Sequence, residues 1–472
     1  MSVAVEVLPR QLFIAGEWRD ASGGATLGVE DPSTGEVFAE VADASPADAV
    51  AALDAAAAVQ EEWAQHPPRE RGEILRRAYE LIVARSDDLA LLMTTEMGKP
   101  VPESKAEVTY AADFFRWFSE EAVRIEGRFA TAPTGAGRLI TMKQPVGPCY
   151  AITPWNFPMA MGTRKIGPAV AAGCTIVVKP AQQTPLSMLA LARILEEAGL
   201  PAGVLNVVTS SSSRAVSEPL ISDPRLRKLT FTGSTEVGRA LVAQAAPGLL
   251  RTSMELGGNA PFLVFADTDV DDAVAGAVIA KMRNMGEACT AANRFHVERA
   301  VAGEFADKLA ERLGSMEIGP LIDAVQRDKV DELVRDAVAR GARVLCGGQK
   351  VDGPGYHYEP TVLVDVPPTA RMLREEIFGP VAPVIAFDGE QEAIDAANDT
   401  EYGLVAYVYT SDIRRAFRVC ERLETGMVGL NQGMVSNAAA PFGGVKASGF
   451  GREGGPEGIE EYLETKYVAM AL

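Results

Sequence analysis

The residues that could do chemistry gather around one cysteine, Cys289, in the polar, glycine-bearing stretch Arg283–Arg294. A thiolate is the strongest nucleophile that a side chain offers near neutral pH. Glu255 precedes it in the chain, in the run Glu255-Leu-Gly-Gly, and could act as a general base. The pair predicts an enzyme that forms and hydrolyses a covalent thioester. Taken alone, a cysteine is more often a small buried hydrophobic residue.

Histidine and metal chemistry fit the chain less well. It has three histidines, and His296 follows Cys289 by seven residues in an alternating, strand-like run. A side chain on that outgoing strand is expected to point away from the thiol, so a carboxylate base is favoured over a Cys–His pair. The five cysteines show no CxxC spacing, which predicts reduced thiols, no disulfide framework and no metal site.

Two segments could bind a phosphorylated cofactor. The loop Phe231-Thr-Gly-Ser-Thr235 lies between a strand-like and a helix-like run, where free N–H groups and the helix dipole favour an anion. It is neither GxGxxG nor a P-loop, and a helix start capped by Ser or Thr is the alternative. Lys179 ends an apolar strand-like run, from which it could reach ribose hydroxyls or a phosphate.

The elements that must position these groups alternate regularly. Helical patterns come first, at 46–64 (with Ser45 as N-cap), 69–97 and 104–124. Strand-like runs at 149–153, 175–179, 204–208 and 228–232 then alternate with helical patterns at 161–172, 186–198, 213–221 and 235–246. This rhythm predicts a parallel, Rossmann-type sheet. A second α/β series over 260–429 predicts a second α/β domain, with a cleft between the two.

Two further segments, 138–144 and 462–470, look like strands without a partner in their own domain. Exposed strands of this kind usually pair with something, so we expect dimerisation by sheet extension, with an extra edge strand as the alternative. The domains are predicted as a cofactor-binding domain (1–127 and 146–252), a catalytic domain (253–445) and a small β oligomerisation element (128–145 and 455–472). A homodimer or homotetramer is expected.

Composition excludes several classes of partner. The 472-residue chain has 47% hydrophobic and 23% charged residues, as is ordinary for a globular protein of two or three domains. Its formal net charge of −19 argues against nucleic acid and anionic membranes, which require basic patches. It has neither a run of about 18 apolar residues nor a signal-peptide pattern at its start, so we expect a cytoplasmic protein with no membrane association.

Assembled in order, these motifs resemble the aldehyde dehydrogenase superfamily from Leu12 to Tyr467. The matching runs are Thr153-Pro-Trp-Asn156-Phe-Pro158, Lys179-Pro-Ala181, Phe231-Thr-Gly-Ser-Thr235, Glu255-Leu-Gly-Gly258, Cys289, Glu375-Glu-Ile-Phe-Gly-Pro380 and Pro441-Phe-Gly-Gly444. The resemblance implies an aldehyde dehydrogenase-like α/β fold that uses NADP or NAD. It also implies that Cys289 attacks the aldehyde, Glu255 activates water, and the Asn156 amide and the Cys289 backbone N–H meet the oxyanion. The cofactor-binding residues that it implies are Thr153, Pro154, Trp155, Lys179, Ala181, Gln182, Gly233, Ser234, Glu255, Leu256, Gly257, Glu376 and Phe378.

Within the superfamily the chain is most similar to succinate-semialdehyde dehydrogenases. The similarity is carried by Thr163-Arg164-Lys165, Lys281-Met-Arg283-Asn284 and Val435-Ser436-Asn437. It implies that Arg164, Arg283 and Ser436 bind the distal carboxylate of a small aldehyde, because a guanidinium binds carboxylate through a fork of donors. Trp117 and Phe442 are expected to line the substrate tunnel. A solvated Arg164, or an Arg283 paired with a structural carboxylate, is the alternative.

Two departures from the family pattern matter. Glu287 stands where glutamine is common, and its charge would raise the pKa of Cys289 unless the side chain is turned away. Gln182 stands where NAD-preferring relatives carry glutamate, and a neutral amide need not repel a 2′-phosphate, so we expect NADP rather than NAD. The alternatives are a glutarate-semialdehyde or broad-specificity aldehyde dehydrogenase, a thioester-transferring relative, and a catalytically silent structural or binding relative. The presence of Glu255 argues against the last two.

Overall fold

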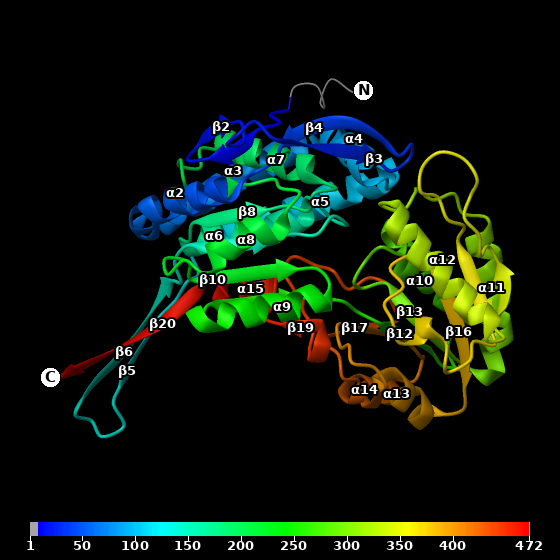
Figure 1. Ribbon diagram of the computed structural model, residues 1–472. Helices are drawn as coiled ribbons and strands as arrows, with labels where there is room; N and C mark the ends of the chain where they lie inside the picture. Colours follow the sequence, from blue (N-terminus) through cyan, green and yellow to red (C-terminus); the bar gives the residue numbers. More distant parts are fainter. Residues whose placement is uncertain (1–7, 472) are drawn as a thin grey trace.

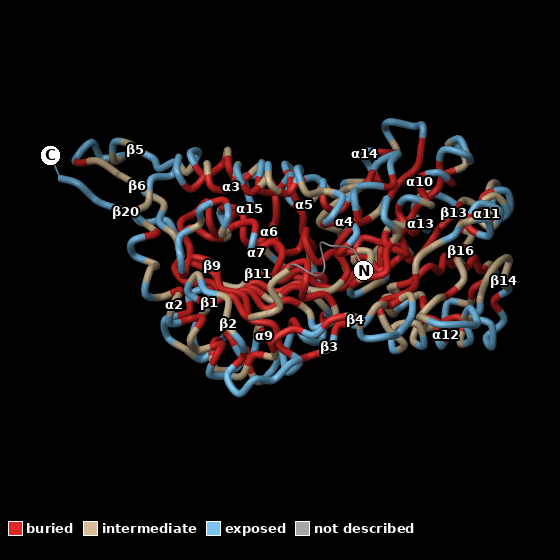
Figure 2. The backbone as a smooth tube through the Cα atoms, turned by 90° about the horizontal axis from the view of Figure 1, so that it is seen from above, coloured by how far each residue is buried: buried red, intermediate tan, exposed pale blue. Residues whose placement is uncertain are grey.

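The computed structural model describes residues 8–471; residues 1–7 and 472 of the predicted domains lie outside this part. Figure 1 shows two α/β bodies and a narrow arm that projects from one of them. The arm is a three-stranded sheet. Figure 2 shows buried chain running through both bodies, whereas the arm is mostly exposed. Within the described part, no helix is long and apolar enough to cross a membrane.

The first body is built on an eight-stranded sheet in the order β19-β11-β10-β7-β8-β9-β1-β2. Its strands are β1 (Leu12–Ile14), β2 (Glu17–Arg19), β7 (Cys149–Ile152), β8 (Ile176–Lys179), β9 (Leu205–Val207), β10 (Lys228–Thr232), β11 (Arg251–Glu255) and β19 (Gly449–Phe450). The central strands β7 to β11 pair in parallel and are almost wholly buried. This is the Rossmann-type sheet that the apolar runs predict, because strands covered on both faces are continuously hydrophobic.

Helices cover both faces of this sheet. They are α2 (Pro46–Gln65), α3 (Pro68–Ala84), α4 (Ser86–Met97), α5 (Val101–Glu121), α6 (Ala160–Ala172), α7 (Pro185–Glu197), α8 (Ser213–Ile221), α9 (Thr235–Ala245) and α15 (Gly455–Glu460). Ser45 caps α2 in a capping box with Asp48, as expected. The helical pattern at 69–97 is two helices, because Arg85 leaves the helical region at φ −109° and ψ 18° and ends α3.

The second body has a seven-stranded sheet in the order β14-β15-β16-β13-β12-β17-β18. Its strands are β12 (Ala260–Val264), β13 (Ala292–Glu298), β14 (Arg343–Cys346), β15 (Thr361–Val364), β16 (Val381–Phe387), β17 (Val405–Tyr409) and β18 (Met427–Leu430). Its helices are α10 (Val270–Met282), α11 (Arg299–Gly314), α12 (Ala324–Ala339), α13 (Glu390–Asn398) and α14 (Ile413–Arg422). The short 3₁₀ turns are η1 (Ala246–Gly248), η2 (Arg283–Gly286), η3 (Arg371–Leu373) and η4 (Lys446–Ser448). Most of this sheet is parallel, as the second α/β series predicts.

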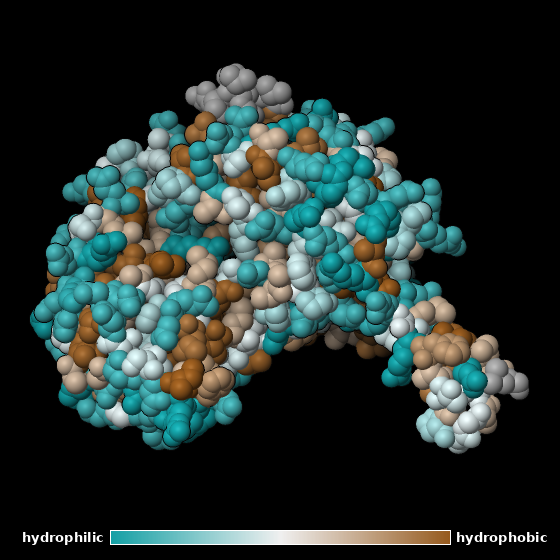
Figure 3. Space-filling view, turned by 180° about the vertical axis from the view of Figure 1, so that it is seen from behind, coloured by the Kyte–Doolittle hydropathy of each residue, from teal (hydrophilic) through white to brown (hydrophobic). Residues whose placement is uncertain are grey.

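The arm consists of β20 (Leu463–Ala471), β6 (Gly137–Pro145) and β5 (Arg128–Thr131), and a separate hairpin joins β3 (Thr26–Asp31) to β4 (Glu36–Ala42). The two strands predicted without partners thus pair with each other, antiparallel, from Leu463 opposite Pro145 to Ala471 opposite Gly137. Figure 3 shows the arm standing clear of the body with hydrophobic groups on its surface. The role of this arm in oligomerisation, and the domain boundaries drawn above, stay predictions.

Candidate active site

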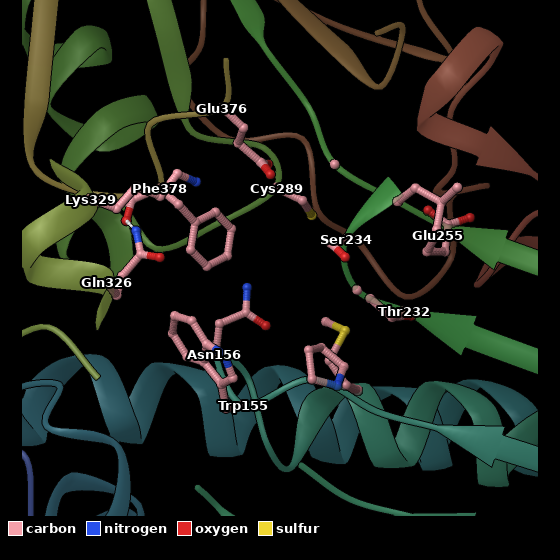
Figure 4. A pocket seen from close by; sticks show the side chains of 15 residues that line it. Trp155, Asn156, Thr232, Ser234, Glu255, Cys289, Gln326, Lys329, Glu376 and Phe378 are labelled. Atoms are coloured by element: carbon pink, nitrogen blue, oxygen red, sulfur yellow. Dashed lines mark hydrogen bonds between the residues drawn. The ribbon is translucent and has the colours of Figure 1, made fainter. Parts of the chain in front are cut away.

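One cavity, of about 230 Å³, collects residues from both bodies (Figure 4). Most of its lining is predicted by the motifs: Pro154, Trp155, Asn156, Gly233, Ser234, Glu255, Leu256, Gly257, Cys289, Glu376 and Phe378. The first body contributes the loop after β7 and the ends of β10 and β11. The second contributes the segment before β13 and the loop before β16. In the first body, parallel strands bring their carboxyl ends to one edge of the sheet, so the motifs at the ends of β7, β10 and β11 meet there.

Cys289 lies between η2 and β13, half-buried, with its thiol facing the cavity. Burial is the main cause that raises its pKa, to about 12, because the low-dielectric surroundings disfavour the thiolate. The carboxylates of Glu376 and Glu255 act in the same direction, whereas the guanidinium groups of Arg164 and Arg283 oppose it. The thiol therefore carries its proton in the resting protein, and the attack needs a proton acceptor.

Glu287 is not among the carboxylates that raise the pKa of the Cys289 thiol. Its side chain is fully buried, and Oε1 accepts a hydrogen bond from the backbone N–H of Ile322 at 3.1 Å. Burial raises the pKa of Glu287 well above its usual range, because the low-dielectric surroundings disfavour the charged form. The side chain is thus turned towards Ile322. Glu287, two residues before Cys289, is therefore not expected to raise the pKa of that thiol.

Asn156 follows β7 and is also buried. Its Nδ2 donates to the carbonyl oxygen of Glu287 at 3.0 Å, and its Oδ1 accepts from the backbone N–H of Phe157 at 3.1 Å. A primary amide has two N–H groups, so one is left for a ligand in the cavity that Asn156 lines. The hydrogen bond to Glu287 ties the amide to the segment that carries Cys289.

Glu255 ends β11, where it is buried, and no residue within 8–471 forms a hydrogen bond with its Oε2. Burial, followed by the neighbouring charge of Glu453, raises the pKa of Glu255 well above its usual range. A carboxylate with a raised pKa is a stronger base, and an unpartnered oxygen on the cavity wall is free to accept a proton from water. The site therefore holds a nucleophile and a base on one cavity.

The opposite wall has the features of a dinucleotide site. Ser234 caps α9, accepting from the N–H of Val237 at 3.4 Å, and leaves the start of the helix open to the cavity. Gly233 allows a close approach here, because a Cβ would lie 2.4 Å from the Phe231 ring. Phe378, at φ 55°, stands edge-on to Trp155 with ring centroids 5.3 Å apart.

Glu376 and Lys179, two of the residues expected to bind the cofactor, lie in different surroundings. Glu376 lines the cavity, accepts from the N–H of Gly258 at 2.9 Å, and has its pKa raised by burial to about 7. Lys179 ends β8, and its Nζ donates to the neutral carbonyl oxygen of Pro180 at 3.0 Å. Burial lowers the pKa of Lys179 to about 8. A buried ammonium with only a carbonyl partner fits a polar or anionic ligand.

Several predicted cofactor residues lie outside this cavity. Gln182 lines a neighbouring cavity of about 300 Å³, together with Gln183, Ser211 and Asp323. Thr153, Lys179 and Ala181 line neither of the two cavities. The backbone N–H of Thr153 donates to the carbonyl oxygen of Lys179 at 3.1 Å, which joins the ends of β7 and β8.

Sequence reasoning missed four residues of the lining: Met161, Thr232, Gln326 and Lys329. Thr232 is the last residue of a predicted strand, so its place at the sheet edge could have been read from the pattern. Gln326 donates to the carbonyl oxygen of Phe378 at 2.6 Å, and Lys329 favours the charged form of Glu376. Both lie on α12, an ordinary amphipathic helix, and no sequence signal marks them.

His296 is buried on β13, away from the cavity, and burial lowers its pKa to about 3.

The structure brings two of the predicted carboxylate-binding residues together. Arg283 is half-buried, and its Nη1 donates to Ser436 Oγ at 3.2 Å. Its guanidinium lies 4.7 Å from the centre of the Phe157 ring and 5.5 Å from that of Tyr110. Within residues 8–471 it forms no ion pair, so the alternative of a structural carboxylate partner is not realised there.

Arg164 has different surroundings. It is 1% exposed, and its Nε lies 2.6 Å from Glu453 Oε2, while Lys165 pairs with the other oxygen of the same carboxylate. The guanidinium also stacks over the ring of Phe442 at 4.1 Å. Its Nη2 has no hydrogen-bond partner among the described residues. The alternative of a solvated Arg164 is therefore excluded, and its contact with a substrate stays a prediction.

Trp117 is half-buried, and its buried Nε1 donates a hydrogen bond to none of the described residues.

The fold and the cavity define a class of protein: a two-sheet α/β oxidoreductase in which a cysteine and a dinucleotide-type sheet edge share one site. The chain belongs to the aldehyde dehydrogenase family, whose sequence model matches residues 18–468. It is 58% identical to a succinate-semialdehyde dehydrogenase of Paenarthrobacter nicotinovorans, over 92% of this chain and 99% of the relative. It is 50% identical to a glutarate-semialdehyde dehydrogenase of Pseudomonas putida, over 99% of each chain. The crystal structure of an NADP-dependent enzyme of E. coli superimposes with a TM-score of 0.97 at 49% identity, covering 99% of each chain. The predicted family and fold class are confirmed.

Proposed function

We propose that this aldehyde dehydrogenase oxidises succinate semialdehyde to succinate with NADP⁺ or NAD⁺. The observation that supports succinate semialdehyde as the substrate is the environment of Arg283. Its half-buried guanidinium lowers the pKa of Cys289 and donates to the hydroxyl of Ser436 rather than to a carboxylate. A half-buried guanidinium without a carboxylate partner is suited to a carboxylate at the far end of a short aldehyde. The relative that is 58% identical carries the name of this activity.

In this proposal the residues of the chain form the covalent bond to the substrate, bind the oxyanion and transfer protons. The Cys289 thiol loses its proton to solvent and its sulfur bonds to the aldehyde carbon, while the Asn156 amide and the Cys289 backbone N–H bind the developing oxyanion. The chemistry that a bound nicotinamide cofactor supplies is acceptance of a hydride. Glu255 then takes a proton from water, whose oxygen attacks the thioester carbon; the carbon–sulfur bond breaks, the sulfur receives that proton from Glu255, and the acid is released.

We propose NADP in preference to NAD. Gln182 is neutral, so it does not repel a 2′-phosphate, and Lys179 places a buried ammonium at the end of β8, three residues earlier in the chain. Ser234, Glu376 and Phe378 would hold the pyrophosphate and the ribose on the nicotinamide side. The NADP-dependent enzyme of E. coli, similar over 99% of both chains, supports this preference.

Glutarate semialdehyde is the second candidate substrate, because the same guanidinium would serve a five-carbon chain and one relative at 50% identity is named for that activity. A thioester-transferring or catalytically silent relative is disfavoured, because Glu255, the base that would hydrolyse the thioester, lies on the cavity wall.

We further propose a cytoplasmic homodimer or homotetramer. The arm supports assembly, because β20 lies at the open edge of its sheet and exposes Tyr467 and Met470 at 58% and 39%. Phe129 on β5 is 66% exposed as well. The cytoplasmic location is supported by five free cysteines, which suit a reducing compartment.

The test is the initial rate of succinate semialdehyde oxidation with NADP⁺ and with NAD⁺, for wild type and for Cys289→Ala. We expect turnover by wild type, a higher kcat/KM with NADP⁺, and no turnover by the variant. Glutarate semialdehyde runs in parallel, and a higher kcat/KM on that substrate would replace the four-carbon assignment. Full activity of Cys289→Ala would contradict the chemistry itself.

A further inference from the structure

Lys99, just before α5, is a buried lysine that touches the active-site loop. It is 1% exposed, and its Nζ donates to the backbone carbonyl oxygen of Asn156 at 2.8 Å. The same ammonium lies 4.4 Å above the ring of Phe157. Burial lowers the pKa of Lys99, because the charged form loses its hydration. Keeping such a group in the interior is costly, so its contacts are expected to serve a purpose.

Glu107, on the second turn of α5, completes this contact from the other side. Its Oε2 pairs with Lys99, and its Oε1 accepts from the backbone N–H groups of Met159 and Ala160, at 3.0 and 3.2 Å. Those groups open α6, whose N-cap residue, Met159, has no capping side chain of its own. The carboxylate supplies the missing cap and complements the helix dipole. Lys99 and Glu107 thus hold both ends of the short segment 156–160.

Glu103, between them on the same face of α5, holds the other half of the site. Its Oε2 accepts from the backbone N–H of Asn284, in the turn that precedes Cys289. Asn284 and Met285 have φ of 55° and 53°, a left-handed conformation that residues other than glycine rarely adopt. Such a turn persists only when its surroundings fix it.

Asn284 joins the two halves. Its Nδ2 donates to the carbonyl oxygen of Asn156 and to that of Glu287, each at 3.0 Å. The amide of Asn156 donates to the same Glu287 oxygen. The carbonyl oxygen of Asn156 therefore accepts hydrogen bonds from Lys99 and Asn284. The side chain of Asn156 is hydrogen-bonded to the segment that carries Cys289.

We propose that Lys99, Glu103 and Glu107 are positioning residues that fix the Asn156 amide and the Cys289 segment relative to each other. This inference rests on the proposed function, in which the Asn156 amide and the Cys289 N–H bind the oxyanion together. Two donors on separate loops stabilise one oxygen only if their spacing is held, and a displacement of about 1 Å can cost on the order of 10² in rate. Lys99 and the adjoining face of α5 set that spacing.

The test is a double-mutant cycle between Lys99→Met and Asn156→Ala, with kcat and KM measured at saturating NADP⁺. Lys99→Met is expected to lower kcat about 10²-fold, with the KM for the aldehyde within about threefold of wild type. In the Asn156→Ala background the same change is expected to cost less than about threefold, because the group that it positions is gone. Equal losses in both backgrounds would show a merely structural role and overturn the proposal.

Lys228→Met is the matched control. Lys228, the first residue of β10, is likewise fully buried with a lowered pKa, but it donates to Ser253 on β11. Its loss is expected to leave kcat within about threefold of wild type. A 10²-fold loss there would mean that any buried lysine has this effect, which would also overturn the proposal.

Glu103 gives a second comparison should Lys99→Met fail to fold. Glu103→Gln keeps an oxygen that accepts from Asn284, whereas Glu103→Ala removes it. We expect kcat to fall at least about tenfold in the alanine variant and to stay within about threefold of wild type in the glutamine variant. Equal kcat values for the two would overturn the proposal.

All variants are assayed on succinate semialdehyde and on propanal. Wild-type turnover of propanal alone would refute the proposed substrate, and the cycle could still be read on propanal. Turnover of neither aldehyde would overturn the proposed function together with this inference.

Discussion

Glu376 is predicted to suppress the reactivity of Cys289 in the protein without cofactor. Its carboxylate is, after burial, the largest cause that raises the pKa of the thiol, to about 12. Glu376→Gln removes the charge and keeps an oxygen to accept from the N–H of Gly258. The pKa of Cys289 should therefore fall, while burial still holds it above its ordinary value.

The size and the pH range of this effect follow from the two pKa values. At a pKa of 12 the thiolate fraction at pH 9 is about 10⁻³, and each unit of pKa changes it tenfold. With burial still the dominant cause, we expect a fall of about one unit and a tenfold gain in thiolate. Glu376 itself has a pKa of about 7, so its charge is complete above about pH 8 and largely lost below pH 6. The gain should appear at high pH and vanish at low pH.

The assay is the rate of alkylation of Cys289 by iodoacetamide between pH 6 and pH 10, followed on the peptide by mass spectrometry. Glu375→Gln is the control, because Glu375 is adjacent in sequence but pairs with Arg371. The reasoning is refuted if Glu376→Gln gives no acceleration above pH 8. Equal acceleration in Glu375→Gln would refute it as well.

Three further predictions concern the cofactor, the base and the buried ion pairs. Gln182→Glu should lower kcat/KM for NADP⁺ about tenfold and leave kcat/KM for NAD⁺ nearly unchanged, since only NADP⁺ has a 2′-phosphate to repel. Equal losses of kcat/KM for the two cofactors, measured from initial rates, would contradict this. Glu255→Gln should accumulate the acyl adduct on Cys289, visible in the intact mass, and rapid turnover without an adduct would speak against Glu255 as the base. Glu453→Ala leaves Arg164 and its neighbour without their carboxylate and should lower the free energy of unfolding by about 3–5 kcal/mol in urea denaturation; a loss below about 1 kcal/mol would show that water replaces it.

The parts of the fold that local patterns determine could be predicted from the sequence. The boundaries of α8 and β10 agree with the predicted runs to the residue, because apolar periodicity and turn residues mark them. The break at Arg85 could not be predicted, because no proline or glycine marks it. The pairing of β20 with β6 joins residues more than 300 positions apart, and a strand pattern alone does not name its partner.

The site divides in the same way. The residues around Cys289 and Glu255 lie in contiguous motifs, so their types and spacing predict them. Lys99 and Lys329 reach the site through tertiary contacts, and nothing in their own segments indicates this. The partner of Arg164 is another such case, because Glu453 lies 289 positions further along and no local pattern could relate the two.

The central claim is that Arg283 recognises the distal carboxylate of the aldehyde. It is tested most directly by the ratio of kcat/KM for succinate semialdehyde to that for propanal, in wild type and in Arg283→Met. Arg116→Met, a change at a half-exposed position on α5, is the control. The account predicts that the ratio falls about 10–100-fold in Arg283→Met through loss of the semialdehyde activity alone. An unchanged ratio would contradict it.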